Sequence, residues 1–127
     1  MSATPISSHE LKNGLVLIFM DESKKIAGDR WYVRVGVSIE IPVDKKWFAD
    51  GSMDDVRFNQ IAEALGENVV FSQKKERNFV SDDTKEQLIQ DICKQTREMG
   101  QAYMGSDSFA TKFILKSYAE RQQRPLL

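Results

Sequence analysis

The chain has 127 residues, of which 41% are hydrophobic and 29% are charged. This length fits one domain, over residues 1–127 with flexible ends at 1–5 and 122–127, that buries a core without disulfides or metals. The 18 basic and 19 acidic residues leave a formal charge of −1, which excludes the broad positive field of most nucleic-acid-binding proteins.

Cysteine and histidine each occur once, as Cys93 and His9. One cysteine excludes an internal disulfide. One cysteine and one histidine are also too few for a closed Cys/His zinc site, which needs four ligands. The N-terminus has no basic region followed by an apolar stretch, and the longest apolar run, residues 15–20, is far shorter than the roughly 20 residues of a membrane-spanning helix. We therefore expect a cytoplasmic protein with no metal, no cofactor and no membrane partner.

The first predicted element is a hairpin over residues 7–20. Residues 15–20 are apolar on both faces, which predicts a central strand covered at least in part on both sides. Asn13 and Gly14 precede this strand and both accept a positive φ, so they predict a tight type I′ turn. Such a turn sets His9 opposite Ile18.

The second predicted element is a long strand over residues 30–41, reached through a connection at 21–29. Its odd positions are apolar and its even positions are mostly polar, which predicts one buried and one wet face. Gly36 is a candidate bulge or bend, and Pro42 ends the strand. The apolar positions are Trp31, Val33, Val35, Val37, Ile39 and Ile41.

A helix and an edge strand are predicted next. Apolar residues from Phe58 to Leu65 recur at helical spacing, after cap-type residues at 52, 54 and 55 and before Gly66. The stretch 69–80 is predicted to be an edge strand, because its central charges discourage edge-to-edge aggregation. These charges are Lys74, Lys75, Glu76 and Arg77.

Two further helices are predicted after residue 81. Ser81, Asp82 and Asp83 are start signals, and Asp83 with Glu86 has the spacing of a capping box. Gly105 separates the two helices. The first has an apolar stripe of Leu88, Ile89, Ile92, Cys93 and Met99, extended by Tyr103, and the second has one of Phe109, Phe113, Ile114 and Tyr118. The order predicts an α+β fold, in which an antiparallel sheet of three N-terminal strands and one later strand carries about three helices on one face.

The connection before the long strand is a candidate ligand site. Two lysines and an arginine suit a phosphate or carboxylate, and an indole can stack on a ligand. The alternative is a solvated hairpin with its tryptophan in the core. The candidate ligand-binding residues are Lys24, Lys25, Asp29, Arg30 and Trp31.

A second candidate site is an interaction surface. Trp47 and Phe48 lie in a connection, where exposed aromatic side chains often mark contacts, although aromatics that fold over the sheet edge are more common. Lys74, Lys75 and Arg77 of the edge strand complete this set.

No residues converge as a catalytic set. The acidic pairs at 54–55 and 82–83 are better explained as helix caps, and Cys93 as a buried side chain. Our leading hypothesis is a non-enzymatic protein-interaction or self-associating module, with a homodimer formed through residues 69–80. The alternative is a small enzyme or ligand-binding domain that holds an anionic metabolite at residues 24–31.

Overall fold

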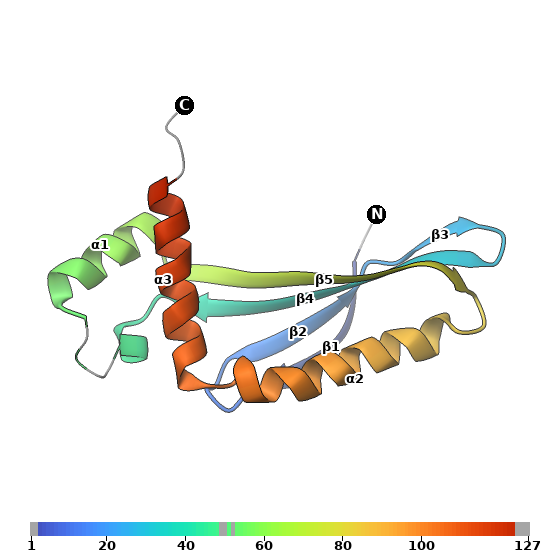
Figure 1. The fold of residues 1–127 in the computed structure, drawn as a ribbon, viewed down its shortest axis with the longest axis horizontal. Coiled ribbons are helices and arrows are strands. Elements are labelled where there is room, and N and C mark those ends of the chain that lie inside the picture. Colours follow the sequence, from blue (N-terminus) through green and yellow to red (C-terminus); the bar gives the residue numbers. More distant parts are fainter. Residues whose placement is uncertain (1–2, 49–50, 52, 124–127) are drawn as a thin grey trace.

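The computed structural model describes residues 3–48, 51 and 53–123, and within them it has a five-stranded sheet and three α-helices (Figure 1). The cap-type residue at 52 lies outside this description. The elements are, in chain order, β1 (Thr4–Glu10), β2 (Val16–Asp21), β3 (Lys24–Ala27), β4 (Arg30–Pro42), the 3-10 helix η1 (Lys45–Phe48), α1 (Asp55–Leu65), β5 (Asn68–Ser81), α2 (Lys85–Tyr103) and α3 (Asp107–Gln123).

The sheet is built around β4. β2 and β3 pair antiparallel with successive parts of one edge of β4, β1 pairs with β2, and β5 follows the whole other edge. The predicted antiparallel sheet and the predicted edge strand are confirmed. The expected connection at 21–29 contains an additional short strand, β3, because Lys24 and Lys25 pair with Tyr32 and Trp31.

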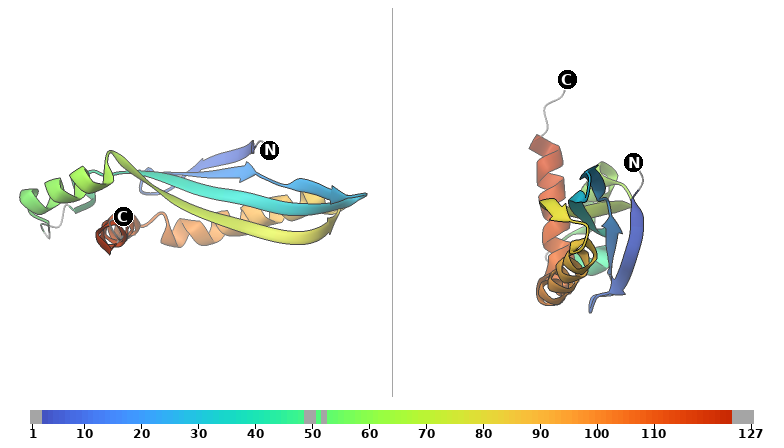
Figure 2. Two further views of the ribbon diagram at one scale, coloured as in Figure 1. Left: turned by 90° about the horizontal axis from the view of Figure 1, so that it is seen from above. Right: turned by 90° about the vertical axis from the view of Figure 1, so that its right-hand side faces the viewer.

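The core lies between one face of the sheet and α2. Leu17 and Phe19 of β2 are fully buried together with the odd positions of β4 from Val33 to Ile41. α2 runs along this face, as two of the views show (Figures 1 and 2). The α+β class is therefore confirmed, and the alternation in residues 30–41 correctly indicates which side chains the helices cover.

The first turn differs from the sequence-based expectation. Residues 12–14 form the loop, which Leu11 and Leu15 close with a backbone hydrogen bond of 2.7 Å, and of the loop residues only Gly14 has a positive φ. A type I′ turn requires a positive φ at both central residues, so it is excluded. His9 lies opposite Leu17 instead of Ile18, which directs its side chain to the helix-covered face.

The helix α2 also differs in its start and its buried stripe. Its N-cap is Thr84, whose side chain makes no capping hydrogen bond, so the predicted capping box at Asp83 is wrong. The stripe continues from Cys93 through Thr96 and Gly100, both buried, and not through Met99 and Tyr103. The latter two are 76% and 62% exposed.

The other helices lie at one end of the sheet. Asp54 caps α1 by accepting a hydrogen bond from Arg57 N at 2.7 Å, and Gly66 ends the helix as predicted. α1 extends beyond the end of β4 and β5, and α3 runs across that end (Figures 1 and 2). None of the three described helices is long and apolar enough to cross a membrane.

Candidate functional site

The predicted ligand-binding residues lie at the far tip of the β3–β4 hairpin. Lys24, Lys25, Asp29 and Arg30 are exposed there, with Arg30 Nε 3.9 Å from an Asp29 oxygen. The cavities beside Trp47 and along β5, described below, are lined by none of them.

Trp31 is engaged within the protein. Its indole Nε1 donates a hydrogen bond to Asp82 Oδ1 at 2.8 Å, and Lys85 Nζ lies 3.8 Å from its ring centroid. The indole therefore joins β4 to the segment that begins α2, and Asp82 serves this contact.

Trp47 and Phe48 separate in the structure. Trp47 is half-buried between two concavities of about 610 and 480 Å³, and its Nε1 donates to Pro42 O at 3.0 Å. Phe48 is only 3% exposed and packs edge-on against Phe58. Phe48 thus belongs to the core and offers no contact surface, because the 3-10 turn of η1 directs it inward.

The surroundings of His9 and Cys93 change the pKa of each side chain. His9 Nε2 lies 3.0 Å from Ser7 Oγ, and burial, followed by the charge of Arg97, lowers the pKa of His9 below its ordinary value of 6.5. Burial, followed by the Asp21 carboxylate, raises the pKa of the buried Cys93 thiol. Among the described residues, no group of three or more His, Cys, Asp and Glu side chains is arranged to hold a metal ion.

The outer edge of β5 is regular over residues 68–77. These residues pair with β4 from Pro42 to Val33 without a shift of register, and within the part of the chain that the structure describes β5 has no second strand neighbour. A bulge then displaces the register, and Phe79 adopts a φ of 58° with 72% of its surface exposed. A positive φ is unusual for a bulky residue, so the regular edge ends at this bulge.

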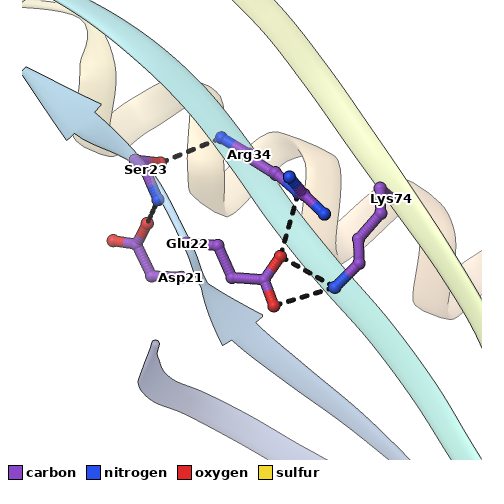
Figure 3. Close-up of polar contacts among 5 residues, drawn as sticks. All are labelled: Asp21, Glu22, Ser23, Arg34 and Lys74. Atoms are coloured by element: carbon purple, nitrogen blue, oxygen red, sulfur yellow. Dashed lines mark hydrogen bonds and ion pairs between the residues drawn. The ribbon is translucent and has the colours of Figure 1, made fainter. Parts of the chain in front are cut away.

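The charged side chains of β5 have different surroundings on its two faces. On the face away from the helices, Lys74 Nζ donates to both carboxylate oxygens of Glu22 at 2.8 Å, and Arg34 Nε lies 3.1 Å from the same carboxylate (Figure 3). On that face the Glu76 carboxylate, by hydrogen bonding first and also by its charge, raises the pKa of Tyr32. On the face of the sheet away from the helices, the charge of Lys74 is thus neutralised by Glu22.

The helix-side face of β5 has cations without this neutralisation. Lys75 and Arg77 lie opposite Val35 and Val33, whose side chains point toward α2. Among the ion pairs between described residues, neither cation has a carboxylate partner. Arg77 Nη1 donates to the backbone oxygen of Glu76 at 2.7 Å.

A groove of about 500 Å³ lies between this face of β5 and the flank of α2. One end is cationic, at Lys75 and Arg77. The other end is aromatic and apolar, where Phe71, Met99 and Tyr103 line the wall. Phe71 is held there by Phe109 and Phe113, with ring centroids 5.4 and 5.6 Å away. None of the described residues that line the groove is acidic.

Sequence reasoning found the cations of this groove but not its apolar wall. The sequence places Met99 and Tyr103 in the core because Met99 lies seven residues after Ile92 and Tyr103 four residues after Met99, both of which are helical spacings. The available signal was Gly100, because a small residue on a helix leaves room for a neighbouring side chain. Here that side chain is Met104, whose Cε occupies the space that a Cβ on Gly100 would need. A stripe through Gly100 places Met99 and Tyr103 on the flank.

Comparisons of the chain with protein-family models, with curated proteins and with solved structures find no match in any of the three. His9, Asp29, Arg30 and Trp47 do not line one cleft. His9 lies in β1, Asp29 and Arg30 at the hairpin tip, and Trp47 at the opposite end of the sheet (Figure 1). Within the part of the chain that the structure describes, the groove along β5 combines an open backbone edge, cations without a carboxylate partner and exposed apolar side chains.

Proposed function

We propose that this chain is a non-enzymatic protein-binding module, in which the β5 edge and its groove hold an extended segment of a partner protein. An extended segment that adds to a sheet edge gains main-chain hydrogen bonds, and its alternate side chains enter neighbouring pockets. The observation that carries the proposal is the long regular edge of β5 over residues 68–77, lying directly beside the groove.

Two further features support this assignment. Edge strands are normally short, bulged or covered, since unpaired N–H and C=O groups attract other strands. Here the bulge at Phe79 follows residues 68–77, so it leaves the edge of that ten-residue segment regular. Met99 and Tyr103 also leave apolar surface in water beside that edge, and tyrosine and arginine are enriched among residues that dominate binding energies.

Selection from an unbiased displayed peptide library tests the proposal. We expect the enriched peptides to slow hydrogen exchange of the β5 amide groups that point away from β4, while amides of β1, which is also an edge strand, stay unchanged. A matched control library with N-methylated backbones should enrich no binder at β5. The proposal fails if no peptide is enriched, or if the enriched peptides protect the β3–β4 tip and leave β5 unaffected.

A further inference from the structure

Resting on the proposed function, we infer that the partner segment is an acidic strand of another protein that pairs antiparallel with β5. Two of its carboxylates lie opposite Arg77 and Lys75, and an apolar side chain lies opposite Phe71. The occupant is thus neither a second copy of this chain nor a neutral strand.

The charge of the groove favours an acidic occupant. Lys75 and Arg77 lack carboxylate partners among the described residues, whereas Lys74, on the other face, is held by Glu22. A partner carboxylate between the strand and the helix gains a charge-assisted hydrogen bond or ion pair that no described residue supplies. Covering the same cations with a neutral strand would remove water from them without compensation.

The sequence of β5 disfavours a second copy. Consider two β5 edges paired antiparallel, with both sets of helices on one side of the joined sheet. A register centred on Lys74 or on Lys75 sets that lysine opposite its own copy. A register centred on Glu76 sets the glutamates opposite each other and Lys75 opposite Arg77. Like charges directly opposite destabilise a strand pair, so these three registers are opposed. Registers centred on Ser72 or Gln73 avoid like charges but set Lys75 opposite Val69 or Phe71, so in none of the five does a second copy place a carboxylate opposite Lys75.

The strand direction fixes the order of side chains in the partner. An antiparallel segment meets Arg77 first, then Lys75, then Gln73 and finally Phe71. Because successive side chains alternate between the faces, only every second residue enters the groove. The expected order from the N-terminus is therefore acidic, any, acidic, any, polar, any, apolar. The bulge at Phe79 prevents regular pairing beyond Arg77.

Fluorescent peptides with this order test the inference. The acidic probe has glutamates at the first two groove positions and leucine at the last. Its three controls are a lysine probe, a probe of reversed order, and an acidic probe N-methylated on the residues that would bond β5. The protein variants are Lys75→Glu with Arg77→Glu, and a matched double reversal on the exposed face of α3, Lys112→Glu with Lys116→Glu.

We expect the acidic probe to bind the wild-type protein and the α3 variant equally, and the β5 variant at least about tenfold more weakly. The lysine probe should bind only the β5 variant, which also proves that this variant is folded. N-methylation and reversal of the order should each weaken binding at least about tenfold.

Other outcomes overturn the inference in ways that separate it from the proposed function. Equal binding of the acidic and lysine probes to wild type rejects the acidic partner but leaves β5 as a binding edge. A dimer of this chain whose β5 amides are protected from exchange makes a second copy the occupant. If no probe binds and no library peptide protects β5, both the inference and the proposed function are wrong.

Discussion

The glycine at the centre of β4 makes room for an ion cluster on the open face of the sheet. A Cβ on Gly36 would lie 2.9 Å from Glu22 Oε2 and 3.2 Å from Lys74 Nζ. We expect Gly36→Val to displace both side chains and to lower the free energy of unfolding by about 1–2 kcal/mol, despite the higher strand propensity of valine. Urea denaturation measures this change.

The matched control is Ser38→Val, the next position of β4 on the same face. It adds the same branched side chain to the same strand and should leave the free energy of unfolding unchanged or slightly raised. Equal losses in the two variants would show that the open face tolerates no valine, and that the cluster is not the reason.

At this scale the sequence predicts less than the structure shows. Gly36 was expected to be a bulge or a bend, yet it pairs in regular register with Met20 and Lys74. The reason for a glycine there comes from the side chains of Glu22, in the connection between β2 and β3, and of Lys74 in β5. Only the three-dimensional pairing of the strands brings them close to Gly36. A local pattern contains no such information.

Asn13 connects two turns that are distant in the sequence. Its Nδ2 donates to Met104 O at 2.9 Å and to Ser106 O at 3.1 Å, and its Oδ1 accepts from Leu15 N. We expect Asn13→Ala to lower the free energy of unfolding by about 2 kcal/mol, because two carbonyl groups and one amide lose their partner. Thermal and urea unfolding measure this, with the exposed neighbour Lys12→Ala as control, within about 0.5 kcal/mol of wild type.

A smaller effect of Asn13→Ala, equal to that of Lys12→Ala, would mean that water replaces these hydrogen bonds. In that case the β1–β2 loop and the α2–α3 connection would be held together by packing alone.

The elements themselves were predicted well where one periodicity covers the whole segment. β4 alternates over its full length, and its buried face is the predicted one. The stripe of α2 failed in its second half, where Thr96 and Gly100 replace apolar residues. Threonine and glycine are not apolar enough to indicate burial in a sequence pattern. The sequence pattern therefore continues the buried stripe through the next apolar residues, Met99 and Tyr103. The same error concealed the apolar wall of the groove.

For the whole molecule, the sequence predicts the layers but not their lateral placement. An amphipathic sheet and amphipathic helices must bury their apolar faces together, which is sufficient for the α+β class. Whether α2 covers all of the sheet depends on side-chain packing between elements. In the structure, α2 does not cover the helix-side face of β5 at Gln73, Lys75 and Arg77, and these three side chains line the open groove. The sequence therefore predicts that Lys75 and Arg77 are charges of an edge strand. It does not predict that they lie beside a groove.

The edge charges also determine the assembly state of the whole molecule. If Lys75 and Arg77 keep β5 strands of different copies apart, the wild-type protein is a monomer at tens of micromolar, contrary to the homodimer expected from the sequence. Lys75→Thr with Arg77→Thr removes this repulsion and adds residues that favour strands, so we expect concentration-dependent self-association. Sedimentation equilibrium measures the assembly state of both proteins. Lys112→Thr with Lys116→Thr on α3 is the control that should stay monomeric.

High salt should make the wild-type protein self-associate as the β5 variant does, because salt screens exposed charges. A wild-type dimer at low salt, or a β5 variant that stays monomeric, would show that these cations do not govern the edge.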